Sequence, residues 1–410
     1  MRLAVFTNQF PARLSTFFAR DMRALLDAGI EIDILPLYPL DASLWAWVPA
    51  DLGPAALPPR RVHHLSRLAG IALPGAAQRP RLGGFVRDVA RVERAAAAYG
   101  PEPLVKSAYA ALKAWAWFER LGAERYDHVL AYWGNYSATA AYLFHRAAGR
   151  SVPFSMFVHA RMDLYRKPAF LVEKMLYADT VFLVCDFNRR YLAQHYPADF
   201  ALLEPKLRTH HIGIDLAAVE FAPGPRPPAR LLAVGRLEPL KGYRELLQTV
   251  ALLAERGRPV ELELIGGGPQ ERELRRLADQ LGIAASVRFA GWRKPAEVLA
   301  AMRRATLFVH APVALDAMPT VLKEALAVGT PAIGSDLAGI PEILDGGRCG
   351  VLVPPGDVAA LAEAIAGLLG APDRRAELAR RGREHASRMF DARSNGARLA
   401  EALLATRARM

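Results

Sequence analysis

The sequence has few cysteines and no long hydrophobic run, and both absences restrict what the protein can be. Cys185 and Cys349 are the only cysteines in 410 residues, so the chain offers neither a disulfide framework nor a cysteine cluster for a metal. No stretch reaches the roughly 18 consecutive apolar residues of a membrane-spanning helix. The first residues, MRLAVFTNQF, lack the apolar core and cleavage site of a signal peptide. We therefore expect a cytoplasmic protein in a reducing compartment.

The sequence also lacks the patterns of dinucleotide-binding enzymes and those of nucleic-acid-binding proteins. The first strand leads into TNQFPARLS rather than into a dinucleotide fingerprint, which argues against a nicotinamide-dependent oxidoreductase. The net charge of +12 would suit nucleic acid, but there is no helix-turn-helix, RNP-like strand or zinc-finger spacing. Much of the charge lies in residues 60–125, which hold 12 Lys and Arg against 5 Asp and Glu. Such a stretch also suits anionic lipid or a phosphorylated substrate.

Short apolar runs alternate with helical patterns through both halves, as in parallel sheets covered by helices on both faces. The chain is long enough for two domains. The stretch APGPRPP, residues 222–228, cannot continue a helix or a central strand and is expected to be a linker. We predict an α/β protein with two doubly wound, Rossmann-like domains, residues 1–221 and 229–385, and a helical segment, 386–410, that could cross back to the first domain. Ligands would then bind at the carboxyl ends of the strands, in a cleft between the domains.

Two segments of the second half could hold an anionic ligand. In GRLEPLKG, Gly235 ends a strand and lets a ligand approach the backbone, while Arg236 and Lys241 suit a diphosphate. A solvated basic loop is the alternative for this segment. From Ile265 the chain runs into three consecutive glycines and a proline at a helix N-terminus, where backbone N–H groups can face an anion. A plain turn explains this second segment equally well.

The third segment is DAMPTVLKEALAVGTPAIGS, residues 316–335, in which two acids lie eight positions apart. Pro319 suits the first turn of a helix, so the N–H groups around Met318 to Val321 would receive phosphate or sugar oxygens. Asp316 precedes them and could accept hydrogen bonds from sugar hydroxyls. Glu324 lies one turn into the helix, where its two oxygens could accept from both hydroxyls of a ribose.

These segments resemble those of the retaining glycosyltransferases of family 4, which have the two-domain fold called GT-B. The resemblance covers most of the chain, and in the second half it also includes VRFAGW and GIPEILDGGRCGVLVPPGD. In the first half it rests on FTNQFPARLSTFF, VHARMDLYR and the CDFNRRYL…HHIGIDL run, which are less specific. Within the family, the chain most resembles enzymes that build exopolysaccharide and other surface glycans.

The resemblance implies an acceptor-binding first domain, a nucleotide-sugar-binding second domain, and a role for each matching residue. Arg236 and Lys241 would hold the donor diphosphate, Glu324 the ribose and Asp316 the donor sugar. His159 matches a histidine that faces the donor sugar across the cleft, although a satisfied histidine at a strand end is the alternative from the residues alone. The other donor-binding residues would be Gly235, Gly291, Trp292, Arg293, Ala317, Met318, Pro319, Thr320 and Val321.

The sequence departs from the family pattern at several positions. Asp316 stands where the family usually has Glu, and its side chain is one methylene shorter, which puts the donor sugar and the activity in question. The run Leu14 to Phe17 reads Leu-Ser-Thr-Phe instead of Ser-Glu-Thr-Phe, and Tyr132 stands where relatives often have His. Both of these changes lie in the acceptor domain and put the identity of the acceptor in question.

The resemblance also implies a reaction. No two aspartates lie two positions apart, so the D-x-D metal site of many glycosyltransferases is missing. Arg236, Lys241 and helix-start N–H groups would stabilise the leaving nucleotide instead. We expect retaining, metal-independent transfer without a cofactor, from a UDP- or GDP-sugar to a glycan or lipid-linked acceptor in surface polysaccharide synthesis. The alternatives are a non-catalytic sugar-nucleotide-binding or scaffold protein of the same fold, and a GT-B phosphorylase that uses phosphate as acceptor.

The acceptor is expected to bind the first domain, close to a membrane. LWAWVP, residues 44–49, and KAWAWFERL, residues 113–121, place four tryptophans near the basic stretch. Aromatic residues beside Lys and Arg suit the surface of an anionic membrane, so we predict peripheral association with the inner face of the plasma membrane. Core packing of the tryptophans behind a solvated basic face is the alternative.

Overall fold

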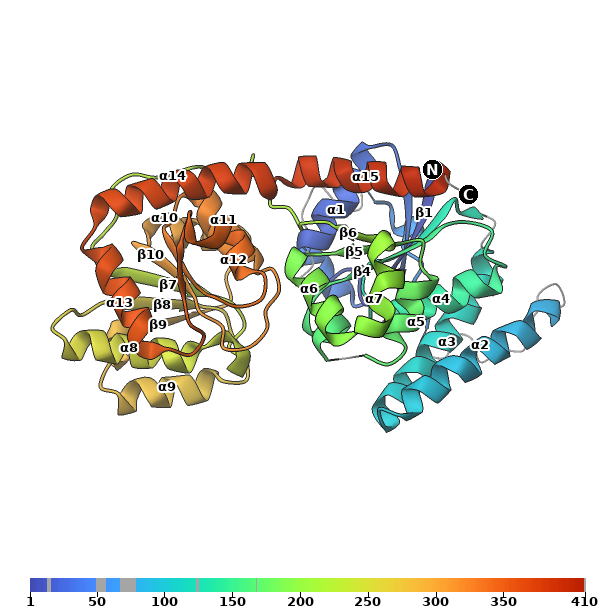
Figure 1. Cartoon of the computed structure of the whole chain (residues 1–410), viewed down its shortest axis with the longest axis horizontal. Helices are drawn as coiled ribbons and strands as arrows, with labels where there is room; N and C mark the ends of the chain where they lie inside the picture. The colour runs from blue at the N-terminus through green and yellow to red at the C-terminus, as the bar shows by residue number, and fades with distance from the viewer. Residues whose placement is uncertain (13–15, 49–56, 67–78, 123–124, 167, 409–410) are drawn as a thin grey trace. The chain divides into compact units, whose positions relative to one another are not determined.

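The computed structural model describes residues 1–12, 16–48, 57–66, 79–122, 125–166 and 168–408. The described chain forms two compact units, residues 1–213 with 392–410 and residues 214–391 (Figure 1). The chain passes from the first unit to the second between residues 213 and 214 and returns between 391 and 392. The sequence predicted these boundaries at 221/222 and 385/386. The reason lies in Arg226, which donates hydrogen bonds of 2.6 to 2.9 Å to the backbone carbonyls of Ala222, Met302, Arg303, Ala305 and Gly329. These bonds tie the proline-rich stretch to the second unit.

The first unit is built on a parallel six-stranded sheet in the order β2-β1-β3-β4-β5-β6. Its strands are β1 (Arg2–Thr7), β2 (Glu31–Pro36), β3 (His128–Ala131), β4 (Phe154–Val158), β5 (Thr180–Leu183) and β6 (Leu207–Thr209). Its helices are α1 (Thr16–Asp27), α2 (Arg79–Ala97), α3 (Pro101–Leu121), α4 (Tyr136–Ala147), α5 (Leu171–Tyr177), α6 (Asp186–His195), α7 (Pro197–Leu203) and α15 (Ala392–Ala408).

The C-terminal helix α15 belongs to the first unit because it packs closely on α1 (Figure 1). At the crossing, a Cβ on Gly396 would lie 2.0 Å from the Cβ of Ala24, so glycine is needed for this approach. The helices α2 and α3 lie side by side and pack on α4 (Figure 1). On α3, Trp115 and Trp117 are buried in the core of the unit.

The second unit has its own parallel six-stranded sheet, in the order β12-β11-β10-β7-β8-β9. Its strands are β7 (Arg230–Val234), β8 (Glu261–Ile265), β9 (Val287–Gly291), β10 (Leu307–His310), β11 (Ala332–Ser335) and β12 (Val351–Val353). Its helices are α8 (Tyr243–Glu255), α9 (Glu271–Gln280), α10 (Pro295–Arg304), α11 (Thr320–Val328), α12 (Ile340–Ile343), α13 (Val358–Leu369) and α14 (Pro372–Met389).

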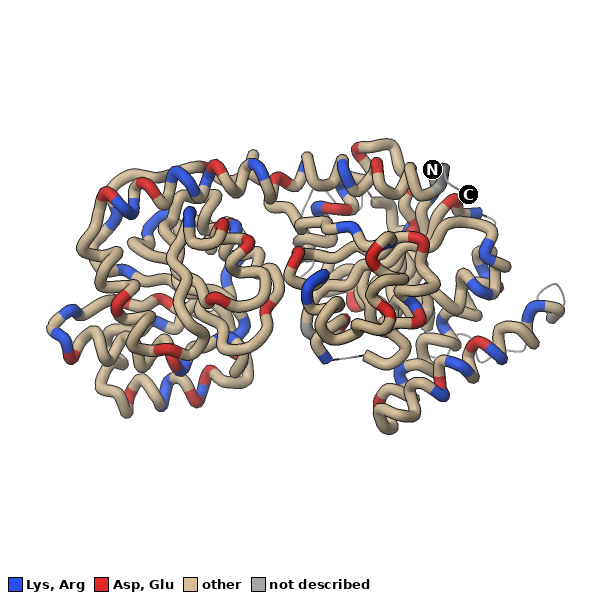
Figure 2. Tube along the Cα trace, viewed as in Figure 1, with Lys and Arg blue, Asp and Glu red and all other residues tan. Residues whose placement is uncertain are grey.

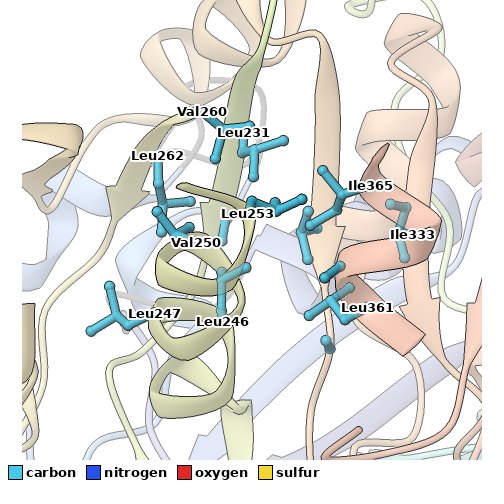
Figure 3. Packing of buried hydrophobic residues seen from close by; sticks show 14 of the residues in the cluster. Leu231, Leu246, Leu247, Val250, Leu253, Val260, Leu262, Ile333, Leu361 and Ile365 are labelled. Carbon is cyan, nitrogen blue, oxygen red and sulfur yellow. The ribbon is translucent and has the colours of Figure 1, made fainter. Parts of the chain in front are cut away.

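One apolar core cluster of the second unit lies between the sheet and helices α8 and α13 (Figure 3). Leu231 and Leu262 extend from β7 and β8 towards Leu246 and Val250 of α8, and Ile365 comes from α13. The strands are nearly continuous apolar runs because helices cover both faces of a parallel sheet. The prediction of two doubly wound α/β sheets is therefore confirmed.

Each sheet has one point where the order of its strands reverses, between β1 and β3 in the first unit and between β7 and β10 in the second. At such a point the loops that leave the two central strands diverge, and ligands of open parallel sheets bind in the crevice that results. In the second unit these loops begin at Gly235 and Ala311. No helix of the described residues is long and apolar enough to cross a membrane.

Replacement of Arg226 by Met is expected to destabilise the second unit by about 2–4 kcal/mol, because the carbonyls that the guanidinium serves lose a charged donor. Hydrogen exchange of the amides in residues 295–310 measures this loss. The exposed Arg258 supplies the control, since Arg258→Met should change the exchange by less than about 0.5 kcal/mol. Equal protection in the two variants would show that the proline-rich stretch is not anchored by Arg226.

Candidate functional site

The loop that follows β7 is held against the loop that follows β8 by close backbone contact. Gly266 has a φ of +136°, and a Cβ there would lie 1.9 Å from the carbonyl oxygen of Gly235. A Cβ on Gly268 would lie 2.6 Å from the carbonyl oxygen of Leu237. The N–H of Leu237 in turn donates to the carbonyl of Gly267 at 3.1 Å. These contacts require glycine at positions 266 and 268, and together with the hydrogen bond they hold the two loops side by side.

Lys241 and Asp316 meet at the strand-order reversal of the second sheet. The Nζ of Lys241 lies 2.5 Å from Oδ2 of Asp316, and the Nε2 of His310 lies 3.1 Å from the same oxygen. His310 is the last residue of β10, and Lys241 ends the short turn Pro239–Lys241. The approach requires glycine at the next position, since a Cβ on Gly242 would lie 2.0 Å from the carbonyl oxygen of Ala311.

The charges of this cluster follow from its burial. Burial raises the pKa of the Asp316 carboxyl, but Lys241 and the hydrogen bond from His310 outweigh burial and hold the pKa well below its usual range. Burial lowers the pKa of His310, against the opposing effect of Asp316, so His310 is a neutral imidazole. An ionised carboxylate only accepts hydrogen bonds, so Nε2 of His310 carries the proton and donates it. Burial and the Asp316 charge also raise the pKa of the neighbouring Tyr243 hydroxyl.

Arg236 has an acidic partner of its own. Its Nη2 lies 2.8 Å from Oε1 of Glu238, and the Arg236 side chain is half exposed. The two basic residues expected at a diphosphate are thus each neutralised by an acid of this unit. An incoming dianion would compete with Glu238 for Arg236 and with Asp316 for Lys241.

Helix α11 begins directly after the Asp316 loop. Pro319 is its N-cap, and no side chain caps the helix, so the first N–H groups, from Thr320 and Val321, lie at an end without a side-chain acceptor. Ala317 and Met318 are buried, and a Cβ on Gly339 would lie 2.0 Å from the carbonyl oxygen of Ala317. This contact fixes the helix start in place. Glu324 is half-buried, in the second turn of α11.

The end of β9 places an indole beside the glycine loop. Gly291 has a φ of +67°, and the Trp292 side chain that follows is 39% exposed. A Cβ on Gly267 would lie 2.8 Å from Nε1 of Trp292, so the indole packs on that glycine. Arg293 lies next to Trp292, with Nη1 donating to the Trp292 carbonyl at 3.1 Å. Arg293 also lines a pocket of about 270 Å³ with Glu297 of α10.

His159 belongs to the first unit, where it directly follows β4. The Nε2 of His159 lies 2.7 Å from the carbonyl oxygen of Tyr132, and a carbonyl only accepts, so Nε2 carries the proton. The imidazole packs on the indole of Trp133, with ring centroids 4.4 Å apart. Burial lowers the pKa of His159 to about 4, against the opposing effect of the Tyr132 carbonyl. A neutral imidazole results, which cannot carry positive charge to a ligand at physiological pH.

The structure places three aromatic residues of the first unit in its core. Tyr132 is fully buried, and its hydroxyl donates to Oδ2 of Asp21 at 2.5 Å. Trp115 and Trp117 are also core residues, and the proposed aromatic membrane surface loses both of them. The core-packing alternative holds for this pair. Leu14 and Ser15, Pro49 and the side chains of Thr16 and Trp47 lie outside the described residues.

The second unit therefore brings together Gly235, Lys241 and Asp316 with the start of α11, and it places Trp292 on Gly267. His159 is part of the first unit and is described there alone. Sequence reasoning missed His310 and Glu238. His310 had a signal, because it is a polar residue at the end of the apolar run LFVH, six positions before Asp316. Glu238 had none, since its pairing with Arg236 depends on the turn.

Lys241→Met is expected to destabilise the second unit by about 1–3 kcal/mol at pH 7, because it leaves a half-buried carboxylate without its cation. The pKa of Asp316 is depressed in the folded state, so the contribution is complete above the ordinary value of 3.8 and is lost as pH falls below it. Thermal unfolding of wild type, Lys241→Met, Asp316→Asn and the double variant gives the coupling energy of the pair. A coupling that stays constant from pH 7 to pH 3 would contradict this assignment.

Comparison with known proteins identifies a family match in the second unit. The glycosyl transferases group 1 family matches residues 221–385. A putative colanic acid biosynthesis glycosyltransferase, WcaL of Escherichia coli K12, is 31% identical over 168 residues, which are 39% of this chain and 41% of the relative. A GDP-mannose-dependent phosphatidylinositol monomannoside mannosyltransferase of Mycolicibacterium smegmatis is 30% identical over 54% of this chain and 62% of the relative. The chain thus spans about two fifths to three fifths of the length of these curated relatives.

Solved structures match over the whole chain. Anabaena HepE in complex with UDP aligns with a TM-score of 0.69 and 17% identity, over 98% of this chain and 99% of the other. Sucrose-phosphate synthase of Thermosynechococcus elongatus aligns with a TM-score of 0.74 and 16% identity, over all of both chains. At such identities the likeness concerns the fold. Residues 221–385 therefore belong to the glycosyl transferases group 1 family, and the whole chain has the two-domain GT-B fold.

Proposed function

We propose that the protein is a retaining, metal-independent glycosyltransferase that moves a sugar from a nucleoside diphosphate sugar to a glycan or lipid-linked acceptor. The observation that carries the proposal is the Lys241–Asp316 contact of 2.5 Å at the strand-order reversal, beside the uncapped start of α11. Lys241 and the helix N-terminus supply positive charge there, and Arg236 lies in the same loop as Lys241. Such an arrangement suits the developing charge of a leaving diphosphate.

Each residue of this site has a role in the proposed reaction. The donor diphosphate draws Lys241 from Asp316 and Arg236 from Glu238, and this exchange of anions leaves the Asp316 carboxylate available to the hydroxyls of the donor sugar. Glu324 accepts from the ribose hydroxyls, and Trp292 flanks the base. Because Lys241, Arg236 and α11 supply the positive charge, the transfer proceeds without a metal ion or cofactor. The acceptor attacks the face from which the diphosphate leaves, and the leaving phosphate takes the acceptor's proton.

The names of the relatives support the substrate class. One relative is named for colanic acid biosynthesis, another for its GDP-mannose donor, and solved structures of HepE contain UDP or UDP-glucose. We infer a UDP- or GDP-sugar donor and a place in surface polysaccharide synthesis. A non-catalytic sugar-nucleotide-binding protein is the second candidate. It is favoured by the short Asp316 side chain, whose carboxylate already contacts Lys241 and His310.

Binding of UDP or GDP is expected to raise the melting temperature by mass action, and this rise should persist in EDTA. Glu324→Gln should require a roughly tenfold higher nucleotide concentration for the same rise in melting temperature, because one charged hydrogen bond to ribose is lost. Arg258→Gln, far from the site in sequence and exposed, is the matched control. Stabilisation by NAD or a short RNA with none by UDP, GDP or ADP would refute the donor site.

Turnover separates the two candidates. If the protein is an enzyme, it should transfer the sugar from the UDP- or GDP-sugar whose nucleotide raised the melting temperature. The product should keep the anomeric configuration of the donor, which the coupling constant of the anomeric proton in NMR reports. A protein that binds the nucleotide in this way and yet transfers no sugar to any acceptor of a membrane-lipid and glycan panel is a binding protein.

We further propose that helix α2 attaches the first unit to the cytoplasmic face of an anionic membrane. Arg87, Arg91 and Arg94 recur at helical spacing on its exposed side, and Figure 2 shows blue bands of Lys and Arg along this helix. None of the three forms an ion pair with a described residue. The buried acid of α2, Asp88, is already paired with Arg146 at 2.9 Å.

Other exposed helices hold some of their arginines in ion pairs. On α9, Arg275 pairs with Glu271, and on α14, Arg380 and Arg381 pair with Glu384 and Glu377. Near the arginines of α2, Val86 and Tyr99 are each 55% exposed. Unpaired cations beside exposed apolar side chains suit a lipid surface with anionic headgroups.

The triple variant Arg87→Gln, Arg91→Gln, Arg94→Gln is expected to bind vesicles with 30% phosphatidylglycerol roughly a hundredfold more weakly than wild type, since each arginine contributes about 1 kcal/mol. Co-sedimentation with the vesicles measures the affinity, and added salt should weaken the binding of the wild type. The matched control removes three exposed arginines of the second unit, Arg258, Arg272 and Arg374. Equal binding by both triple variants, or binding to RNA and not to vesicles, would refute the proposal.

A further inference from the structure

The loops that follow β3 and β4 in the first unit are joined through a buried carboxylate. Oδ2 of Asp163 accepts the backbone N–H of Gly134 at 2.8 Å and that of His159 at 3.3 Å. Asp163 reaches this position because residues 161–165 form a π-helical turn, in which the N–H groups of Leu164 and Tyr165 both donate to Ala160. One oxygen atom thus holds both loops together. The other, Oδ1, is buried and has no hydrogen-bond partner.

Two further buried side chains, Lys174 and Asn188, also hold these loops. We call Asp163, Lys174 and Asn188 together the clamp. The Nζ of Lys174 donates to the carbonyls of Gly134 and Asn135 at 2.9 and 3.1 Å, and to Oγ1 of Thr139 at 3.1 Å. Nδ2 of Asn188 donates to the carbonyls of Val158 and His159. Lys174 therefore fixes the loop after β3, Asn188 fixes the loop after β4, and Asp163 connects them.

The clamp sets the chemistry of the His159 ring. With both loops held, the carbonyl of Tyr132 lies 2.7 Å from Nε2 of His159 and keeps the proton on that nitrogen. Nδ1 then has a lone pair, and it makes no hydrogen bond with a described residue. If the loops moved apart, the ring could rotate or change tautomer, and Nδ1 would become a donor.

Stability alone is a poor explanation for this cluster. Burial raises the pKa of Asp163 to about 6 and lowers that of Lys174 to about 7, which shows that the interior opposes both charges. Apolar residues of similar volume often replace buried charged groups without loss of stability. A clamp made of charges is therefore suited to fixing one conformation of two loops.

We propose that Asp163 is a positioning residue that holds His159 in the Nε2–H tautomer, with Nδ1 as an acceptor for a hydroxyl of the sugar substrate. Asp163 acts through the backbone of Gly134 and His159 and does not touch the substrate. This inference rests on the proposed glycosyltransferase activity, and it adds a requirement on the ligand: the group at Nδ1 must donate a hydrogen bond, so it is a hydroxyl and not a phosphate oxygen.

Two variants of Asp163 separate the clamp from a general loss of folding. In Asp163→Asn, the amide oxygen can still accept both N–H groups, so the tautomer of His159 should persist. In Asp163→Ala, both hydrogen bonds are lost. Asp88→Ala is the matched control, because Asp88 of α2 is also a buried acid that accepts two hydrogen bonds, in its case from Arg146, and it lies outside the clamp.

The first measurement is the tautomer of His159, read from ¹⁵N chemical shifts of histidine-labelled full-length protein and assigned with His159→Gln. We expect Nε2–H in wild type, Asp163→Asn and Asp88→Ala, and a mixed or Nδ1–H ring in Asp163→Ala. The second is transfer kinetics, in which Asp163→Ala should lower kcat about a hundredfold through misplacement of the imidazole. Its donor KM and the melting-temperature rise caused by UDP or GDP should change less than about twofold.

The inference is overturned if Asp163→Ala keeps the wild-type tautomer, or if its kcat falls no further than that of Asp88→Ala. It is also overturned if kcat falls equally in Asp163→Asn and Asp163→Ala while the two differ in tautomer. Absence of nucleotide stabilisation and of transfer in wild type would instead refute the proposed function, and the tautomer comparison would still decide whether Asp163 positions His159.

Discussion

The candidate site depends on close backbone contact between loops that leave neighbouring parallel strands. In a parallel sheet all strands end at the same edge, so the loops after β7, β8 and β10 meet there. They come within contact distance because Gly242 and Gly266 have no Cβ, and a methyl group at either position would overlap a carbonyl oxygen at about 2 Å. Gly242 allows the approach of the Lys241 loop to the loop that carries Asp316, and Gly266 allows the approach of the loops after β7 and β8.

The charges gathered by these loops are balanced before any ligand binds. Lys241 is paired with Asp316, and Arg236 with Glu238, while His310 donates to Asp316 from a buried position. Both ion pairs are partly exposed, and a ligand that replaces the anion of either pair restores the balance of charge. The site is thus suited to exchange its own carboxylates for the phosphates of a nucleotide, and the short Asp316 side chain stays within reach of both partners.

The first unit handles its buried charge differently. Asp163, Lys174 and Asn188 serve mainly backbone groups, and their effect is to fix two loops and the ring of His159. Lys241 and Asp316 of the second unit lie where a ligand can compete for them, whereas Asp163 and Lys174 of the first unit are buried. The neutral state of His159 follows from its burial, because desolvation lowers its pKa more than the hydrogen bond to the Tyr132 carbonyl raises it.

The sequence by itself determined the alternation of strands and helices, the two parallel sheets and the positions of Gly235, Lys241, Asp316 and the α11 start. Hydrophobic periodicity and the placement of Gly and Pro report local conformation directly. Tertiary structure decided the partners, because contacts such as Lys241 with Asp316, or Asp163 with Gly134, join residues far apart in the chain. Tertiary structure also decided which aromatic residues face inward. Trp115, Trp117 and Tyr132 are core residues, although tryptophans close to Lys and Arg in the sequence suited an exposed membrane-binding surface equally well. Burial depends on what packs against a helix or strand, and a local pattern of residue types does not contain that information.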